Sequence, residues 1–387
     1  MRVRPMILCC FASSLLLSAL SLRAADDKMI VGADISMLPE IEKAGGVFLN
    51  AGKPADAIAI FKNHGFNLFR VRLFVNPSKD FNSNWGAIQG FETVRALAKR
   101  IKASGAMLLL DLHYSDTWAD PGKQTKPAAW KDLSFEQLET KVYDYTATVL
   151  RDLKLDGIVP DMVQVGNEIA PGMLWPDGKL VYNTTPEDEE AHWARFAKLF
   201  DAGARAVRDA STPAQPIRVV IHIHGGGHEG LPPWFFNRFT RHTNNFDVIA
   251  LSFYPGPKES FKDLKLNIDE VIKKYGKDVL IAEVAYPWKQ AMDPQHENQT
   301  WPLTPQGQEQ FVRDLMALVR GEPNGRAIGA VWWYPESIQV KGLQIWERGA
   351  KALFDDQGNP LPAMSAFGQS APNDGKPVEA KAVEDSR

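Results

Sequence analysis

The stretch Met162–Gly172, MVQVGNEIAPG, decides the fold, because it reads as a buried strand that runs into a carboxylate. Apolar and β-branched residues lead up to Glu168, and a Pro and a Gly then interrupt the pattern. A carboxylate at the end of a buried strand needs either a polar partner or an opening toward ligand. A parallel barrel provides that opening, because the carboxyl ends of its strands surround the active site.

The same pattern recurs along the chain, and eight short apolar runs predict eight strands. They are residues 29–36, 68–75, 107–113, 162–168, 219–224, 248–254, 279–283 and 330–334. Helical patterns lie between these runs, and three of them, at 54–64, 91–104 and 263–275, are each followed by a glycine suited to a helix end. Sequence pairs typical of helix beginnings are Ser134 with Gln137, Thr185 with Pro186 and Thr304 with Pro305.

Eight β-then-α units predict an α/β protein with one (β/α)8 TIM barrel domain over residues 25–368. The alternative is a doubly wound open sheet, but no glycine-rich phosphate loop follows the first predicted strand. The chain has 387 residues, 44% of them hydrophobic, which is enough for one large core. Residues 369–387 contain no large apolar side chain and are expected to form a disordered tail.

Residues 1–24 have the layout of a secretory signal peptide. Arg2 and Arg4 precede an apolar run from Met6 to Leu22, and small residues around Ala24 provide a cleavage site. A transmembrane anchor is the alternative, which the serines in the run and the missing basic stop disfavour. The mature protein is therefore expected to be secreted, in a periplasm or outside the cell, without membrane attachment.

Composition limits the classes of partner and chemistry. Cys9 and Cys10 both lie in the leader, so the mature chain has no thiol for a disulfide, a nucleophile or a metal site. Loss of the leader's three arginines lowers the count of basic residues from 44 to 41, against 47 acidic ones. This excess of acid, without a basic stripe, predicts no nucleic-acid partner. Eleven Trp fit sugar binding, because the C–H faces of sugar rings pack on indole, although Trp in the core is equally typical.

Polar and aromatic residues stand at the ends of the predicted strands, where a barrel would bring them to one mouth. They are Arg72, His113, Glu168, His222, His224, Ser252, Tyr254, Glu283, Trp332 and Trp333. Hydrolysis of a glycosidic bond with retention of configuration needs two such carboxylates about 5 to 5.5 Å apart. Arg72 and Tyr254 would keep Glu283 ionised as the nucleophile, whereas an apolar setting would keep Glu168 protonated as the acid/base.

The sequence also resembles glycoside hydrolase family 53, the endo-β-1,4-galactanases. The motifs that carry the resemblance are GADIS (32–36), RVRLFVNP (70–77), DLHYSDTWADPGKQ (111–124), VQVGNEI (163–169), LWPDG (174–178) and IAEVAYPW (281–288). The pair Asn167-Glu168 is shared by a whole clan of barrel glycosidases, whereas the loop YSDTWADPGKQ (114–124) is much more specific. The resemblance runs from about Gly32 to Trp333.

This resemblance implies roles for particular residues. Glu168 matches the acid/base, Glu283 matches the nucleophile, and Asn167 matches a residue that hydrogen-bonds the sugar 2-hydroxyl. Arg72 and Tyr254 match groups that orient the nucleophile. The remaining matches are cleft residues and the aromatic floor beneath the cleaved sugar: His113, Trp118, His222 and Trp288 for the cleft, and Trp333 for the floor. The implied substrate is β-1,4-galactan, cut by a monomer that needs no cofactor.

The chain departs from the family pattern in places. Tyr334 stands where the family commonly has an acidic residue, and Ala170-Pro171 replaces polar residues at the cleft edge. Bacterial relatives often bind calcium in the loop after the seventh strand, and here the segment 292–299 offers Asp293, Glu297 and Asn298 among its oxygen ligands, so structural calcium and a solvated loop are both open.

Other functions remain as alternatives. A β-mannanase or a cellulase would share the two Glu but not the loop 114–124. The motif HIHGGGH (222–228) places His222 and His224 at a spacing that can seat a metal, as in barrel amidohydrolases, but only His113 offers a further ligand. A non-catalytic sugar-binding barrel is the third alternative, which the presence of both Glu disfavours.

Overall fold

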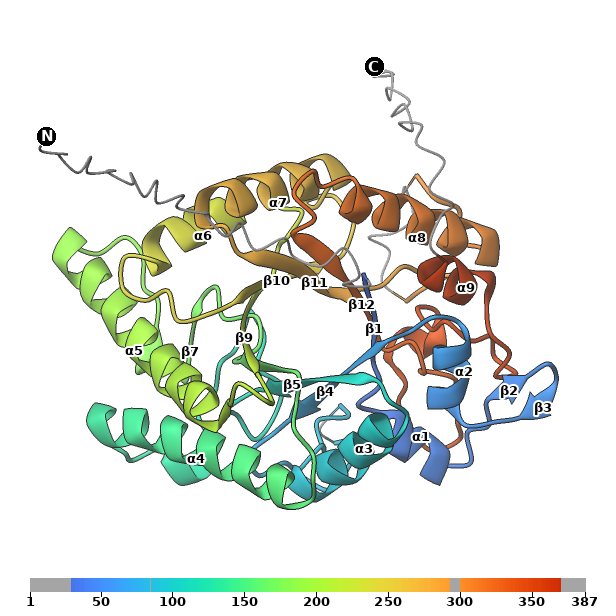
Figure 1. Ribbon diagram of the computed structural model, residues 1–387, viewed down its shortest axis with the longest axis horizontal. Coiled ribbons are helices and arrows are strands. Elements are labelled where there is room, and N and C mark those ends of the chain that lie inside the picture. Colours follow the sequence, from blue (N-terminus) through green and yellow to red (C-terminus); the bar gives the residue numbers. More distant parts are fainter. Residues whose placement is uncertain (1–28, 84, 293–299, 370–387) are drawn as a thin grey trace, which may run out of the picture.

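The computed structural model describes residues 29–83, 85–292 and 300–369. Eight parallel strands form a closed barrel with helices around it (Figure 1), which confirms the predicted TIM barrel. The barrel strands are β1 (Ile30–Asp34), β4 (Leu68–Leu73), β5 (Met107–Leu112), β6 (Met162–Val165), β9 (Arg218–Ile223), β10 (Val248–Phe253), β11 (Asp278–Val284) and β12 (Ala327–Trp333). β1 pairs with β4 on one side and β12 on the other, and this pairing closes the ring. The predicted leader, with its two cysteines, lies outside the described residues, as does the predicted tail from residue 370 on.

Helices cover the outside of the barrel. They are α1 (Leu38–Lys43), α2 (Ala57–Asn63), α3 (Phe91–Ala103), α4 (Phe135–Leu155), α5 (Pro186–Ala210), α6 (Leu231–Phe239), α7 (Phe261–Tyr275), α8 (Pro305–Arg320) and α9 (Pro362–Gly368). Short hairpins join β2 (Leu49–Asn50) to β3 (Lys53–Pro54) and β7 (Gly172–Met173) to β8 (Gly178–Lys179), and single 3-10 turns are η1 (Ala128–Trp130) and η3 (Trp346–Gly349).

The helix beginnings follow the predicted caps at α4, α5 and α8, whereas α2 and α7 begin at residues other than those predicted. Ser134 accepts from the backbone of Gln137, whose side chain accepts in return, and so starts α4. The hydroxyls of Thr185 and Thr304 cap α5 and α8 by accepting from the backbone N–H groups of Asp188 and Gly307. The helix predicted over 54–64 begins three residues late, at Ala57, because its cap is the side chain of Asp56. The helix predicted over 263–275 begins two residues early, at Phe261, because the side chain of Ser260 caps it.

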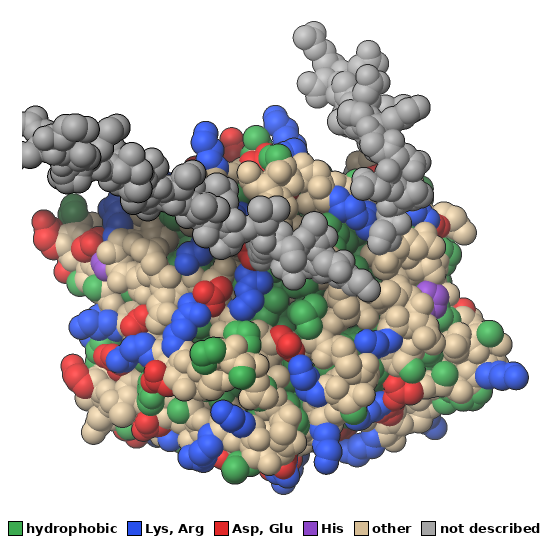
Figure 2. Space-filling model, viewed as in Figure 1, with side chains coloured by type: hydrophobic (Ala, Val, Ile, Leu, Met, Phe, Trp, Pro, Cys, Tyr) green, Lys and Arg blue, Asp and Glu red, His purple; other side chains and the backbone are tan. Residues whose placement is uncertain are grey.

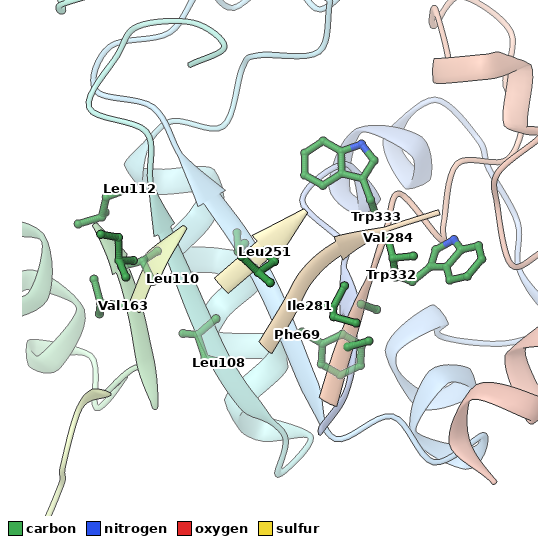
Figure 3. Close-up of a cluster of buried hydrophobic side chains, with 14 of the residues drawn as sticks. Phe69, Leu108, Leu110, Leu112, Val163, Leu251, Ile281, Val284, Trp332 and Trp333 are labelled. Atoms are coloured by element: carbon green, nitrogen blue, oxygen red, sulfur yellow. The ribbon is translucent and has the colours of Figure 1, made fainter. Parts of the chain in front are cut away.

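The barrel interior changes from apolar to charged along the strands. Near the amino-terminal ends, inward side chains form an apolar plug that includes Ile30, Leu68, Leu109, Met162, Val220, Val248, Leu280 and Val331. Two residues further along β4, β5, β6 and β9, the inward side chains are Arg70, Asp111, Gln164 and His222, all fully buried. Side chains on the opposite strand faces, such as Leu108, Leu110 and Leu112 of β5, belong to the larger core cluster that includes the helices (Figure 3).

The surface carries charges of both signs. Figure 2 shows Lys and Arg side chains interspersed with Asp and Glu over the visible face, without a block of either kind. Among the residues that the structure describes, no helix is long and apolar enough to cross a membrane.

One position where β12 meets β1 is expected to tolerate only glycine. Gly329 has a φ of +149°, and an added Cβ would lie 2.1 Å from the carbonyl oxygen of Ile30. Gly329→Ala is therefore expected to lower the free energy of unfolding by about 3 kcal/mol or more, from backbone strain and overpacking together. Urea unfolding followed by circular dichroism measures the loss.

Gly325→Ala is the matched control for this prediction. Gly325 also has a positive φ, +63°, but an added Cβ would meet nothing within 4 Å. Its replacement is expected to cost only about 1 to 2 kcal/mol. Equal losses in the two variants would show that the close approach of β12 to β1 does not restrict the side chain.

Candidate active site

One arginine occupies the centre of the barrel mouth. All five N–H groups of Arg70 have partners on other elements, and the side chain is fully buried. The accepting oxygens are Gln164 Oε1 at 3.2 Å, Asp34 Oδ2 at 3.1 Å, Glu283 Oε1 at 2.7 Å, Asp111 Oδ2 at 2.8 Å and Asn167 Oδ1 at 2.8 Å. Arg70 therefore joins β4 to β1, β5, β6 and β11.

The prediction that Arg72 orients Glu283 is wrong. Arg70 makes that contact, whereas Arg72 donates to Asp34 at 3.0 Å and to the Tyr334 hydroxyl at 3.0 Å. Both arginines point inward because they are two residues apart on β4, but Arg72 lies one step closer to the opening. Its guanidinium is 4.8 Å from the centroid of the Trp333 ring, so it lies against the aromatic wall.

A β-bulge turns Glu283 inward. Leu251 of β10 pairs with Ile281, but the next residue, Ser252, pairs with Glu283, so β11 carries one extra residue, Ala282. Glu283 is 4% exposed and accepts from Arg70 and, at 3.1 Å, from the Tyr254 hydroxyl. Burial raises the pKa of Glu283, and the positive charge of Arg70 opposes that rise.

Glu168 lies beyond the end of its strand. The predicted strand 162–168 is too long, since β6 ends at Val165 and both Gly166 and Glu168 have positive φ, +82° and +50°. The turn leaves Glu168 partly exposed, with its Oε1 accepting from the Ser252 hydroxyl at 2.7 Å. Burial raises the pKa of Glu168 well above the usual range, and the charge of Glu283 raises it further.

Asn167 and His222 form the buried base of this site. Asn167 Nδ2 donates to the Ala119 carbonyl at 2.9 Å, and its Oδ1 accepts from Arg70. His222 Nε2 lies 2.9 Å from Ser252 Oγ, and its Nδ1 lies 3.0 Å from Asn167 Oδ1. Burial first, and then the charge of Arg70, lowers the pKa of His222 well below its usual range, so the ring is neutral.

Aromatic rings line one side of the mouth. The rings of Trp118 and Trp333 meet edge to face with their centroids 6.0 Å apart, and the centroid of the His113 ring lies 6.0 Å from that of Trp118. His113 Nε2 is also 3.0 Å from Asp111 Oδ2, which ties it to the central charges. Trp288 lies apart from this group, with its indole N–H donating to Gly349 O in η3. The structure thus brings together the predicted site residues except Trp288 and Trp332. The ring of Trp332 does not reach the mouth, because it points outward from β12 and packs against Phe311 of α8 and Phe367 of α9.

Two segments of the sequence contain candidate metal ligands, residues 292–299 and 222–228. The segment with Asp293, Glu297 and Asn298 lies outside the described residues. Within the described ranges, no group of three or more His, Cys, Asp or Glu could hold a metal ion. Both ring nitrogens of His222 are in hydrogen-bond contact with protein groups, so this residue is already engaged as a structural side chain.

Sequence reasoning missed several residues of the site. Four of them are buried inside the barrel and lie in predicted strands and family motifs, but no role was predicted for them: Asp34, Arg70, Asp111 and Gln164. The alternation of side chains along a strand could have identified them, because each of these polar residues occupies a position whose side chain points into the barrel. Ser252 was predicted at a strand end, but its contact with Glu168 joins β10 to the turn after β6, which no local pattern connects.

The chain is similar in sequence and in fold to known glycoside hydrolases. The family model for glycosyl hydrolase family 53 matches residues 30–367. An arabinogalactan endo-β-1,4-galactanase of Cellvibrio japonicus is 33% identical over 92% of this chain and 95% of that protein. An endo-β-1,4-galactanase of Bacillus subtilis is 31% identical over 87% of this chain and 85% of its own. A solved family 53 catalytic domain from Ignisphaera aggregans superimposes with a TM-score of 0.79, at 32% identity over 89% of this chain and 97% of that domain.

The central arginine leads to a test. Arg70→Met leaves Asp34, Asp111 and Glu283 without their shared cation, so it is expected to lower the free energy of unfolding by roughly 3 to 5 kcal/mol. It is also expected to raise the pKa of Glu283, because Arg70 opposes the effect of burial. Urea unfolding and a carbon-13 NMR titration of the Glu283 carboxyl measure the two effects.

Arg72→Met serves as the control. It removes the contacts to Asp34 and Tyr334 but leaves Arg70 on Glu283, so the pKa of Glu283 is expected to stay near that of the unmodified protein. A rise as large in Arg72→Met as in Arg70→Met would mean that Arg70 does not control Glu283.

Proposed function

Because the chain belongs to glycoside hydrolase family 53, we propose that it is an endo-β-1,4-galactanase that cuts the β-1,4-galactan side chains of pectin, as in arabinogalactan type I. The observation that carries the proposal is the pair of carboxylates in unequal surroundings. Glu283 accepts from Arg70 and Tyr254, whereas Glu168 accepts from the uncharged Ser252. The charge of Arg70 thus favours the ionised form of Glu283, whereas burial and the charge of Glu283 favour the protonated form of Glu168, as glycoside hydrolysis requires.

The proposed reaction proceeds in two displacements with retention of configuration. Glu283 attacks the anomeric carbon while Glu168 gives its proton to the leaving oxygen, so the glycosidic bond breaks and a glycosyl ester forms. Water then attacks the same carbon, Glu168 takes the water's proton, and Glu283 leaves as a carboxylate. This mechanism needs a short distance between the two carboxylates, and Ser252 supports it. Ser252 hydrogen-bonds Glu168 and pairs with Glu283 on the neighbouring strand, and neighbouring strands lie about 4.8 Å apart.

The electrostatics of the pair support both roles of Glu168. The negative charge of Glu283 is one of the causes that raise the pKa of Glu168. Formation of the glycosyl ester neutralises Glu283 and removes that cause, so the pKa of Glu168 falls when it must act as the base. Activity is therefore expected to rise with pH as Glu283 ionises and to fall as Glu168 loses its proton.

Neighbouring residues supply sugar contacts in this proposal. Trp333 provides a floor for the galactose ring, and Trp118 adds a second aromatic surface against it. Asn167 donates one amide hydrogen to Ala119 O, and the second is proposed to bind the sugar 2-hydroxyl.

We also propose that the protein is exported and acts as a monomer. The support for export is the leader pattern of residues 1–24, and the support for a monomer is that one chain supplies both carboxylates. Amino-terminal sequencing of the exported protein and its mass in solution test these two points. A first residue other than Ala25 would move the cleavage site.

Removal of either carboxylate provides the first test. Glu168→Ala is expected to lower kcat on galactan by about 10² to 10⁴, and Glu283→Ala by more, because one loses the acid/base and the other the nucleophile. Melting temperatures are expected to change by only a few degrees, as neither side chain fills the apolar core. Loss of the fold in both variants would reassign the two residues as structural.

Glu187→Ala is a suitable control for these variants. Glu187 is exposed in the first turn of α5, a helix on the outside of the barrel, so its loss is expected to leave kcat unchanged. An equal fall of kcat in Glu187→Ala would point to a general effect of charge rather than to the two site carboxylates.

The products provide the second test. Short galacto-oligosaccharides are expected from β-1,4-galactan, with none from β-mannan, cellulose or arabinan incubated in parallel. Proton NMR of fresh product is expected to show the β-anomer first, because two displacements restore the configuration. Initial α-anomer would mean inversion, and products from another polymer alone would identify a different substrate for the same pair of Glu.

A further inference from the structure

Ser252 stands between the acid/base and a buried histidine. It is 1% exposed at the end of β10, and its Oγ lies 2.7 Å from Glu168 Oε1 and 2.9 Å from His222 Nε2. A serine hydroxyl has one hydrogen to donate and two lone pairs with which to accept. Ser252 can therefore donate to only one of these neighbours and must accept from the other.

The tautomer of His222 decides the direction. The ring is neutral, because burial and the charges of Arg70, His113 and His224 lower its pKa. One ring nitrogen thus carries hydrogen and the other accepts. If Nε2 carries the hydrogen, it donates to Ser252, and the serine hydrogen is directed to Glu168. If Nδ1 carries it, the serine hydrogen is directed to His222.

The surroundings of Nδ1 favour the first arrangement. The backbone N–H of Glu168, which can only donate, lies 3.4 Å from Nδ1. The Gln164 amide nitrogen lies 3.1 Å from Nδ1 and also faces Asp111 Oδ1 at 2.6 Å, Gly166 O at 3.1 Å and Asn167 Oδ1 at 3.1 Å. The one acceptor near Nδ1 is Asn167 Oδ1 at 3.0 Å, and this oxygen already accepts from Arg70 at 2.8 Å. Nδ1 is therefore the accepting nitrogen, and Nε2 carries the hydrogen.

We propose that Ser252 and His222 are positioning residues that fix Glu168 Oε1 and so direct its transferable proton to Oε2. The inference rests on the proposed role of Glu168 as the acid/base. Oε1 accepts from Ser252 in both states of Glu168, as a carboxylate oxygen or as the carbonyl oxygen of the protonated acid. Neither the acid step nor the base step then requires the carboxyl group to rotate.

Several charged groups face Glu168, but Ser252 contributes separately from them. Glu283 of β11 and Asp120 of the loop after β5 raise the pKa of Glu168, whereas Arg70 of β4 lowers it. Tyr254 follows β10 and stays protonated, because burial and the nearby carboxylates raise its pKa. The Ser252 hydrogen bond lowers the pKa of Glu168, and its removal leaves the charged neighbours in place.

The test is a titration of Glu168 in three proteins. Carbon-13 NMR of its carboxyl is expected to report a pKa about one unit higher in Ser252→Ala, because a hydrogen bond to the charged form is lost. The upper limb of the activity profile is expected to move by the same amount, and kcat to fall about tenfold. Ser252→Thr keeps the hydroxyl and is expected to restore both. An unchanged pKa in Ser252→Ala would overturn the proposal.

Thr146→Val is the matched control. Thr146 is a fully buried hydroxyl in α4, 2.7 Å from the Tyr114 hydroxyl and remote from Glu168. Its loss is expected to lower the melting temperature without moving the pKa of Glu168. A shift of that pKa in Thr146→Val as well would assign the effect in Ser252→Ala to general loosening of the core.

A second measurement is independent of activity. Nitrogen-15 NMR of His222 is expected to show hydrogen on Nε2, and hydrogen on Nδ1 would overturn the proposal. If the unmodified protein leaves galactan intact, the proposed function fails, while the tautomer and the Glu168 titration still decide the role of Ser252. If galactan is cut and either NMR result is contrary, only the present inference fails.

Discussion

The structure depends on one buried guanidinium. Arg70 uses all five of its N–H groups, and their acceptors come from β1, from β5, from β6 and the turn after it, and from β11. A buried cation is tolerated only when its charge and hydrogen bonds are compensated, so these elements must hold their acceptors in place. The same contacts position Glu283 and Asn167, and barrel closure and site geometry therefore share one cause. A lysine could not replace this arginine, because it has three donors on a single nitrogen.

The carboxyl groups of Glu168 and Glu283 are chemically identical, and their neighbours make them behave differently. Burial raises the pKa of both Glu168 and Glu283, but only Glu283 accepts a hydrogen bond from the positive charge of Arg70. The chain places this difference on two irregular pieces of backbone, the bulge in β11 and the turn after β6. Regular strands would have pointed Glu283 outward, so the departure from ideal geometry creates the function.

Periodicity predicted most of the fold, since short apolar runs and capping pairs report local structure that burial and backbone hydrogen bonds enforce. The eight strands, and the beginnings of α4, α5 and α8, follow directly from the sequence. The site was less accessible. Arg72 was chosen over Arg70 because strand-end position cannot tell which of two inward arginines reaches a carboxylate on β11. Strand-end position and the family resemblance both predicted Glu168 and Glu283, but neither the contact of Ser252 with Glu168 nor the bulge in β11 has a local signal.

The apolar plug at the amino-terminal end of the barrel has a further consequence. Its side chains, from Ile30 through Val331, fill the interior below the charged layer, so everything that reaches the carboxylates passes through a single opening. The departing half of a cleaved polymer and the incoming water must use that opening in turn. In the proposed two-displacement reaction, a second saccharide that enters before water would accept the bound glycosyl group. Synthesis and hydrolysis would then compete, and the order in which saccharide and water enter the opening would decide between them.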